Sequence, residues 1–326
     1  MQAGSTWNGV RYRAGGKRHV ESYFIKLNDP QGMRALWLKA TILARPGAEP
    51  VAEAWAVSFD RERGHVGVKE VQPFARARFS SHAMDLAVRD VTFDEGRLRG
   101  AVASAGHAIT FDLHFDSLQA PLAPLPAALY RGPFPSSKLV SPHPHARFTG
   151  SYEVDGVRTA VDGWLGMQGH NWGKGHAFHY GWGHCNQWDD GEDVVFEGVT
   201  ARVKVGPALT PPTTVIAVVV RGVRYLLNTP RALLGARGDV DTRRWAFRGE
   251  GRGARVEGEL SADVEDFAGL LYENPVGPPT YCLNSKIARG RLRVEIDGRP
   301  PIELTTRSAA LEIGTREGPC GVTMVA

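Results

Sequence analysis

Alternation of apolar and polar side chains with a period of two runs through much of the chain. Odd-numbered residues are apolar over 109–115, and even-numbered residues are apolar over 291–296. Successive side chains of a β-strand point to opposite sides, so this period indicates strands with one buried face. Asp-Gly pairs at 155–156 and 297–298 are typical of hairpin turns. No long helical stripe accompanies them, and we predict an all-β protein of antiparallel sheets with few short helices.

A proline-rich stretch from Pro121 to Pro144 separates the strand candidates into two groups. Proline clusters of this kind favour turns and linkers. The chain has 326 residues, which is enough for two domains. We therefore predict two consecutive antiparallel β barrels, one formed by residues 1–140 and the other by residues 141–326.

Charge and cysteine usage exclude several function classes. The 39 basic and 35 acidic residues give a net charge of +4 without any long block of like charges, which argues against a nucleic-acid partner. Cys185, Cys282 and Cys320 lie far apart and form no CxxC pair. The longest apolar run, Val215–Val220, is too short to span a bilayer, and the first thirty residues contain no apolar leader. We expect a cytoplasmic protein with at most peripheral membrane contact.

The segment from Trp164 to Trp188 has the most distinctive composition of the chain. It holds four of the eight tryptophans and four of the eleven histidines, together with six glycines and almost no charge. Rings and hydrogen-bonding groups at this density suit a mostly apolar pocket with a few fixed polar groups. We predict that this segment is the functional centre.

Strand alternation divides the second half of this segment into two faces. One face would carry Phe178, Tyr180, Trp182, His184, Asn186 and Trp188, and the other His179, Gly181, Gly183, Cys185 and Gln187. A histidine and an asparagine in a closed core each need a buried hydrogen-bond partner. We therefore predict that the ring-rich face lines a pocket, with close core packing as the alternative.

The four histidines of the segment also raise the alternative of a zinc site. His170, His176, His179 and His184 do not have the spacing of an HExxH motif or of a zinc finger. No cysteine or carboxylate completes a recognisable ligand set. We therefore expect neither a metal nor another cofactor.

Three stretches carry a resemblance to a known superfamily. They are GHNWG with YGWGHCNQW (within 169–188), SYFIKLNDPQGMRALWLKAT (22–41) and YENPVGPPTYCLNSKIA (272–288). Together they are similar to the lipocalin-related superfamily of tocopherol cyclases, carotenoid 1,2-hydratases (hydroxyneurosporene synthases) and AttH-like proteins. The resemblance touches both halves of the chain. It implies two lipocalin-like (calycin) barrels and an enzyme that protonates an isoprenoid double bond without a metal.

The resemblance also implies roles for individual residues. The His and Trp of the hydratase motif correspond to His170 and Trp172, and the acid of the following strand corresponds most nearly to Glu197, with Asp162 as the alternative acid. A carboxyl buried in apolar surroundings stays protonated to higher pH, which suits a proton donor. Where the hydratases have a tyrosine two residues before the acid, this chain has Val195.

Two functions follow as expectations. The first is a hydratase- or cyclase-type enzyme that acts on an isoprenoid or polyene in an apolar cavity, and the second is a lipocalin-like carrier of a hydrophobic ligand. In both cases the partner is a hydrophobic small molecule, and the oligomeric state stays open. We expect the ligand to contact Gln168, Asn171, Tyr180, Trp182, His184, Asn186, Trp188, Tyr281 and Asn284.

Overall fold

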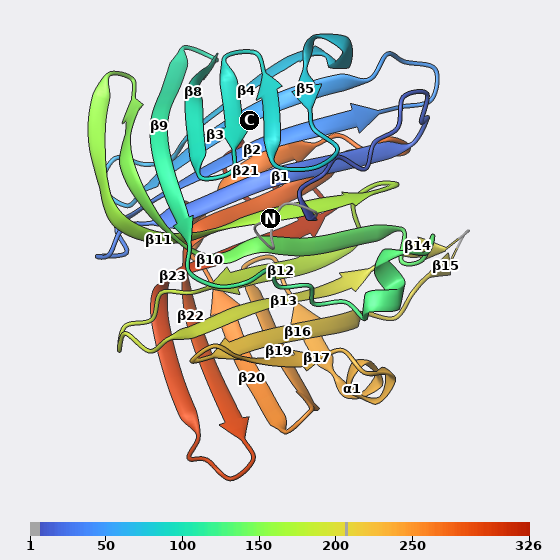
Figure 1. Ribbon diagram of the computed structural model, residues 1–326, viewed down its shortest axis with the longest axis vertical. Helices are drawn as coiled ribbons and strands as arrows, with labels where there is room; N and C mark the ends of the chain where they lie inside the picture. Colours follow the sequence, from blue (N-terminus) through green and yellow to red (C-terminus); the bar gives the residue numbers. More distant parts are fainter. Residues whose placement is uncertain (1–6, 206–207) are drawn as a thin grey trace.

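The computed structural model describes residues 7–205 and 208–326. They form two large antiparallel sheets that curl in opposite halves of the molecule (Figure 1). A small two-stranded sheet, β14 (Lys204–Val205) with β15 (Ala208–Leu209), stands apart from them. One α-helix, α1 (Pro230–Gly235), occurs among the described residues and lies beside the second sheet. None of the described helices has the length and apolar character needed to cross a membrane.

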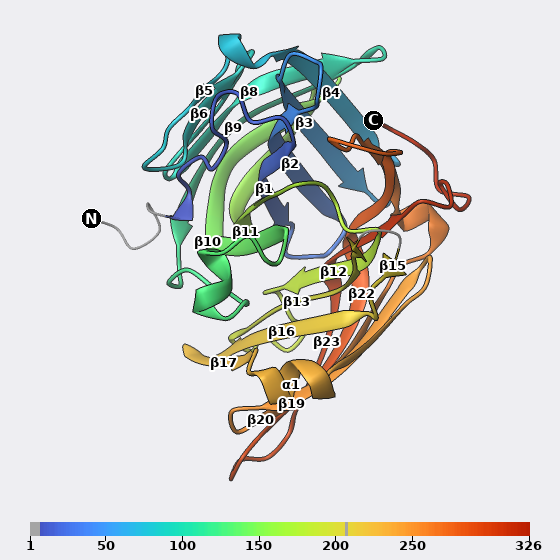
Figure 2. The ribbon, with the colours of Figure 1, turned by 90° about the vertical axis from the view of Figure 1, so that its right-hand side faces the viewer.

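The first sheet contains eleven strands in the order β4-β3-β2-β1-β11-β10-β9-β8-β7-β6-β5. Their bounds are β1 (His19–Asn28), β2 (Arg34–Ala44), β3 (Val51–Asp60), β4 (Val66–Pro73), β5 (Arg78–Phe79), β6 (Asp85–Val88), β7 (Val91–Asp94), β8 (Arg97–Ser104), β9 (His107–Ser117), β10 (Ser137–Val154) and β11 (Val157–Gly173). The sheet curls until β4 lies near β8 and β9 (Figure 2). The 3-10 helices η2 (Phe74–Arg76) and η3 (Ala127–Tyr130) lie in its connections.

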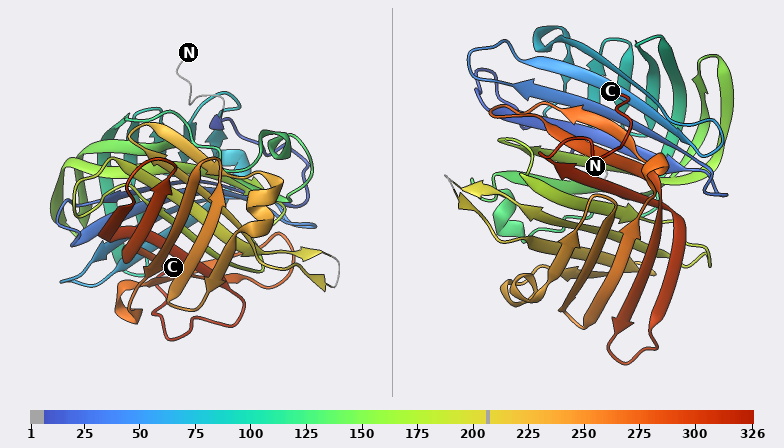
Figure 3. Two further views of the ribbon diagram at one scale, coloured as in Figure 1. Left: turned by 90° about the horizontal axis from the view of Figure 1, so that it is seen from below. Right: turned by 180° about the vertical axis from the view of Figure 1, so that it is seen from behind.

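The second sheet has the order β17-β16-β13-β12-β23-β22-β20-β19-β18, with β21 paired to β22. Its bounds are β12 (His179–Cys185), β13 (Val194–Arg202), β16 (Thr213–Val220), β17 (Val223–Leu227), β18 (Arg237–Val240), β19 (Arg244–Gly251), β20 (Ala254–Ser261), β21 (Ala268–Tyr272), β22 (Thr280–Ile296) and β23 (Ile302–Thr315). The 3-10 helix η4 (Val264–Asp266) precedes β21. This sheet also curls, as the views from below and behind show (Figure 3).

The two sheets repeat one topology. In each, the first strand pairs with the last, β1 with β11 and β12 with β23. In each, a long hairpin brings the last strand back, β10–β11 in the first sheet and β22–β23 in the second. The turn of the first long hairpin is Asp155-Gly156, and both residues have positive φ (50° and 82°), as a tight two-residue hairpin turn requires.

Each sheet wraps its own apolar core. Rings and aliphatic chains such as Phe93, Phe148 and Trp164 fill the first sheet, and Phe196, Trp245 and Phe247 fill the second. Alternation places one set of side chains inside each sheet and the other set outside. The architecture confirms the predicted all-β fold with two lipocalin-like barrels.

The outer faces of the two sheets pack against each other. This sheet–sheet interface includes Phe24 and Trp37 from the first sheet and Trp182 and Ile287 from the second. The last residues of the chain close one side of it, because Val325 bonds to β21 and also reaches Gly67 of β4. The interface is therefore a second buried layer, separate from the two barrel cores.

The predicted division of the chain at residue 140 lies within β10. Strands β10 and β11 both belong to the first sheet, and the chain enters the second sheet at His179. Residues 137–144 of the proline-rich stretch are thus strand and not linker. The prolines there are accommodated because β10 is bulged against β11, which interrupts the regular hydrogen-bond ladder.

Candidate functional site

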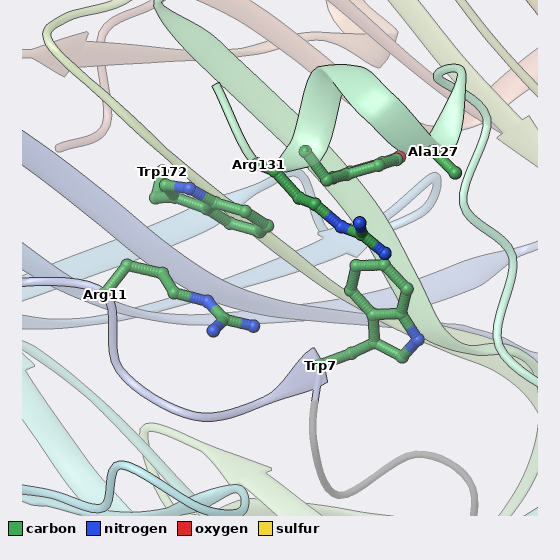
Figure 4. Close-up of a pocket in the computed structure, with 6 residues that line it drawn as sticks. Trp7, Arg11, Ala127, Arg131 and Trp172 are labelled. Atoms are coloured by element: carbon green, nitrogen blue, oxygen red, sulfur yellow. The ribbon is translucent and has the colours of Figure 1, made fainter. Parts of the chain in front are cut away.

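A cavity of about 350 Å³ opens where three segments meet, and we call it the Trp172 cavity. It is lined by Trp7 and Arg11 from the N-terminal segment (residues 7–12), by Ala127, Tyr130 and Arg131 in and after η3, and by Trp172 near the end of β11. Figure 4 shows the guanidinium groups of Arg11 and Arg131 reaching into the space between the rings of Trp172 and Trp7. The volume is in the range of small-molecule sites.

Ring contacts hold the walls of this cavity together. The ring centroids of Trp7 and Tyr130 are 5.2 Å apart in an edge-to-face arrangement, and those of Tyr130 and Trp172 are 6.3 Å apart. The guanidinium carbon of Arg11 lies 5.1 Å from the centroid of the Trp172 ring, which is a cation–π distance. The walls are therefore aromatic, with positive charge at their rim.

His170 lies directly behind Trp172, with 4.9 Å between the ring centroids. Its Nδ1 is 2.7 Å from the carbonyl oxygen of Trp7, and its Nε2 is 2.9 Å from Oε1 of Glu21. A carbonyl oxygen only accepts, so Nδ1 donates to Trp7, while Nε2 faces the carboxylate of Glu21. Both ring nitrogens are thus occupied, and the ring holds Trp7 in place.

Glu21 of β1 is fully buried and is surrounded by donors. The backbone amides of Arg11 and Tyr12 donate to it at 2.8 Å each, and His19 lies 2.7 Å away. Burial alone would raise the pKa of this carboxyl, but hydrogen bonds and charge from His170 and His19 outweigh it and lower the pKa to about 2. Glu21 is therefore ionised at neutral pH, and it binds the N-terminal segment through these hydrogen bonds.

Gln168 lies two residues before His170 on the same face of β11 and also binds the N-terminal segment. Its amide exchanges two hydrogen bonds with Asn8, at 3.0 and 3.1 Å. The inward-facing polar residues of the HNWG region thus bind the N-terminal segment to the mouth of the first barrel. Their combined effect is to position Trp7 and Arg11 at the Trp172 cavity.

Glu197 of β13 is the second fully buried glutamate. Its two carboxyl oxygens lie 2.9 and 2.8 Å from the hydroxyl of Ser141, and Oε1 accepts a 3.3 Å bond from the indole N–H of Trp182. Burial raises the pKa of this carboxyl to about 7, and the two neutral donors only partly oppose the shift. Glu197 is therefore a carboxylic acid that can hold its proton close to neutral pH.

Ser141 reaches Glu197 because β10 is bulged at this point. Val140 pairs with His170 and His143 with Gln168, so two residues of β10 oppose the single residue Gly169. A bulge of this type re-aims the side chains of the longer strand. Here it turns the Ser141 hydroxyl out of the first barrel and toward the second sheet.

The proline-rich strap (residues 118–136) covers the surroundings of Glu197. Leu122 of the strap packs on Val195, Ala217 and Val219, which are on the outer face of the second sheet. Tyr130 at its other end lines the Trp172 cavity and donates a 2.7 Å hydrogen bond to the carbonyl of Leu139. Burial raises the pKa of Tyr130, and the charge of Glu197 adds to this effect, so the two groups are electrostatic neighbours.

His170 and Glu197 lie on different sides of the first sheet. The His170 ring stacks on Tyr23 of the first core at 4.3 Å, whereas Glu197 lies in the sheet–sheet interface beside Trp182. The alternative acid Asp162 is exposed on β11. Asn171 alternates to the face opposite His170, so these predicted site residues do not share one cavity.

The ring-rich face of β12 is in close packing and lines no part of the Trp172 cavity. Tyr180 and Trp182 pack in the sheet–sheet interface. His184 is held neutral, because burial and the charge of Lys26 keep its pKa well below the usual value, and its Nε2 donates to the carbonyl of Pro144 at 2.8 Å. Asn186 donates to the carbonyl of Gly166 at 2.6 Å. The core alternative therefore describes this face.

The remaining predicted ligand contacts are distributed over the second sheet. Trp188 lies in the second core and donates to the carbonyl of Val194 at 2.7 Å. Asn284 bonds to Glu312 at 3.1 Å and accepts a 2.6 Å bond from Lys286 in the sheet–sheet interface. Tyr281 is half-buried and alternates to the other side of β22.

The four histidines of the Trp-rich segment do not converge. His170 bonds to Glu21, His176 to Asn274, and His184 to Pro144. Within residues 7–205 and 208–326 there is no group of three or more His, Cys, Asp and Glu side chains arranged to hold a metal ion.

Comparisons place this geometry among known folds. No protein-family model and no curated protein matches the sequence. The structure of a Nitrosomonas europaea protein assigned as an AttH matches with a TM-score of 0.56 and 17% identity, over 93% of this chain and 98% of that one. Kievitone hydratase from Nectria haematococca matches with a TM-score of 0.56 and 12% identity, over 91% and 89%. This chain has the lipocalin-like fold of AttH-type proteins. The resemblance predicted from the sequence motifs is confirmed at the level of the fold.

Several residues of the site were not predicted from the sequence. Trp7, Arg11, Tyr130 and Arg131 line the cavity but lie in segments without a strand pattern. Glu21 had a usable signal, because a charged residue inside the apolar strand VESYFI needs buried partners. Its partner His170 is 149 residues away, and no local pattern connects the two.

Proposed function

We propose that this protein is a hydratase-type enzyme in which Glu197 protonates a carbon–carbon double bond of a hydrophobic substrate that extends from the Trp172 cavity past Tyr130 to Glu197. The observation that carries the proposal is the Glu197 carboxyl, which is buried and, within the described part of the chain, is bonded to two neutral donors, Ser141 and Trp182. Kievitone hydratase, which shares the fold, supports a hydratase-type activity in this scaffold. The isoprenoid or polyene nature of the substrate is part of the proposal.

The proposed reaction begins with proton transfer from Glu197 to one carbon of the double bond, which leaves a cation on the neighbouring carbon. The aromatic faces of Trp182 and Tyr130, which neighbour Glu197, stabilise positive charge. Water then adds its oxygen to the cation, and the Glu197 carboxylate takes the released proton. The sum is alkene plus water to alcohol, and the acid is regenerated.

Access to Glu197 requires movement of the proline-rich strap, because the carboxyl is fully buried beneath it. Tyr130 lies at the junction, since it lines the cavity and interacts with Glu197. His170 is assigned a positioning role, because both of its ring nitrogens are occupied by Trp7 and Glu21. This revises the catalytic role expected for it from the motif.

The decisive test compares E197Q with D162N, which removes the exposed alternative acid on β11. Each variant is incubated in ¹⁸O-labelled water with kievitone and with a panel of hydrophobic alkenes, and products heavier by one labelled water are counted by mass spectrometry. We expect E197Q to lose at least about 100-fold in turnover, the usual contribution of a general acid, and D162N to lose none. Turnover by E197Q at the wild-type rate contradicts the proposal, and circular dichroism confirms that the variant is folded under the assay conditions.

A carrier function is the second candidate, and one observation favours it. Exposed side chains form the rim of the Trp172 cavity, so a ligand can enter it from solvent. Glu197 is not among the lining residues, so binding does not need its carboxyl. A carrier returns its ligand unchanged. Equal mass and isomer composition before and after incubation, for every compound that binds, favours the carrier over the enzyme.

A further inference from the structure

We infer that the Trp172 cavity recognises a flat, conjugated ligand through an anionic group, which Arg131 binds while the rings of Trp7, Trp172 and Tyr130 contact its carbon frame. The inference rests on the proposed function, since it takes this ligand to be the substrate or a close analogue of it. It adds a chemical class, a planar hydrophobic anion, that a neutral isoprenoid does not satisfy.

The charge of the lining supports an anion. Two of the six lining residues are arginines, and no acidic side chain lines the cavity among the residues that the structure describes. Both guanidinium groups are directed into the same space (Figure 4). The planar guanidinium is the side chain best suited to bind carboxylate or phosphate oxygens.

The rings of the lining support a flat ligand. Trp172 and Trp7 lie on different sides of the space into which the arginines reach (Figure 4), and Tyr130 contacts both rings at centroid distances of 6.3 and 5.2 Å. Aromatic faces bind planar conjugated frames by stacking and edge contacts. An aliphatic chain of equal size has no π system and cannot make these stacking and edge contacts.

The same lining discriminates against neutral ligands. A neutral molecule in the cavity removes water from Arg131 without replacing it by an opposite charge. A carboxylate at the rim replaces that water with charge-assisted hydrogen bonds. Arg131 therefore selects for the anion both by attraction and by the cost of removing water from its charge.

The test measures binding by calorimetry with four probes: 2-naphthoate, 2-naphthamide, 2-naphthyl phosphate and cyclohexanecarboxylate. We expect 2-naphthoate to bind at least about tenfold more tightly than the isosteric neutral amide and than the aliphatic acid, and to weaken as salt rises. The phosphate probe identifies the anion, because tighter binding than 2-naphthoate assigns a phosphate ester and weaker binding assigns a carboxylate.

The variants locate the effect. R131M should weaken 2-naphthoate about tenfold and leave 2-naphthamide unchanged, whereas R13M removes an exposed arginine outside the lining and should change neither. Equal affinities for 2-naphthoate and 2-naphthamide, or an R131M protein that binds 2-naphthoate as the wild type does, overturn the inference.

The outcome is separable from that of the proposed function. E197Q should bind 2-naphthoate with wild-type affinity, because Glu197 does not line the cavity. If E197Q keeps full turnover while R131M loses anion binding, the proposed acid is wrong and the anion site stands. If E197Q is inactive while the amide binds as well as the acid, the reverse holds.

Discussion

Glu21 and Glu197 are both sealed from solvent, and their pKa values are shifted in opposite directions. Glu21 accepts from two backbone amides and the Tyr23 hydroxyl and lies beside two histidines, whereas among the described residues Glu197 accepts from a hydroxyl and an indole. Burial acts on both, so the number and charge of the donors decides which carboxyl is ionised. Two carboxyls whose pKa values are shifted in opposite directions provide a structural anion and a proton donor in one molecule.

The pKa of Glu197 predicts a pH-dependent cost to stability. Between the ordinary glutamate pKa of 4.5 and the raised pKa of about 7, the native state keeps a proton that the unfolded chain has lost, so stability falls as pH rises through this window. The full cost is about 3 kcal/mol. E197Q lacks the charge and should match the wild type near pH 5 and exceed it by about 3 kcal/mol near pH 8. Urea unfolding at both pH values measures this, and a constant difference between the two proteins contradicts it.

Glu21 predicts the opposite dependence. Its lowered pKa stabilises the native state above about pH 4.5, and this contribution is lost as pH falls toward 2. E21Q should therefore cost about 3 kcal/mol at neutral pH and little near pH 2. Urea titrations of E21Q and wild type across this range test the direction, and an E21Q deficit that persists unchanged at low pH excludes it.

Sequence reasoning at the scale of residues reached Glu197 but misplaced its neighbours. The motif resemblance pointed to Glu197 on a strand after HNWG, and its role as the acid stays a prediction. His170 and Glu197 were expected at one cavity, yet alternation on β11 and β13 directs them to the first barrel and to the sheet–sheet interface. Strand faces can be predicted from period two, but which face meets another sheet depends on contacts between distant strands.

At the scale of elements, the N-terminal segment and the proline-rich strap shape the cavity. Neither has a regular period, because each follows the surface of a barrel rather than forming a sheet of its own. The proline-rich stretch was predicted as a linker up to Pro144. Its last residues form the start of β10, because the bulges there let a strand contain prolines. Long strands with clear alternation, such as β9, were predictable from local sequence alone.

His170 should control the order of the N-terminal segment. H170A removes the bonds to Trp7 and Glu21, so residues 7–12 should lose protection from hydrogen exchange and 2-naphthoate should bind about tenfold more weakly. Asn171 offers the matched control, since its side chain is on the other face of the same strand. Protection of residues 7–12 that is equal in H170A and N171A contradicts the positioning role.

At the scale of the whole molecule, polar groups buried between the sheets fix how the halves meet. Lys26 of the first sheet donates to Asn186 of the second at 3.2 Å, and Asn28 donates to the carbonyl of Lys286. Lys286 is fully buried, 2.7 Å from Glu312, and lies over the rings of Trp37 and Trp182 at 5.5 Å each. Groups of this kind specify one docking geometry, because any other leaves them unpaired.

Removal of the Glu312 charge should weaken this interface. E312Q leaves the buried ammonium of Lys286 without an opposite charge, and we expect a loss of about 3 kcal/mol in the free energy of unfolding. The double variant K286M/E312Q removes both charges and should recover part of that loss. Urea unfolding of E312Q, K286M and the double variant provides the comparison, and a double variant as unstable as the sum of the two single changes would exclude a coupled pair.

The repeated topology has a consequence for how the chain is made. Val20 of β1 pairs with Gly173 of β11, so the first barrel closes only after more than 150 further residues have been synthesised. At ordinary translation rates this delay is on the order of ten seconds. Every strand of the first sheet precedes every strand of the second. The nascent chain can therefore complete one barrel on the ribosome and offer its lysine- and tryptophan-bearing outer face as the template on which the second barrel assembles.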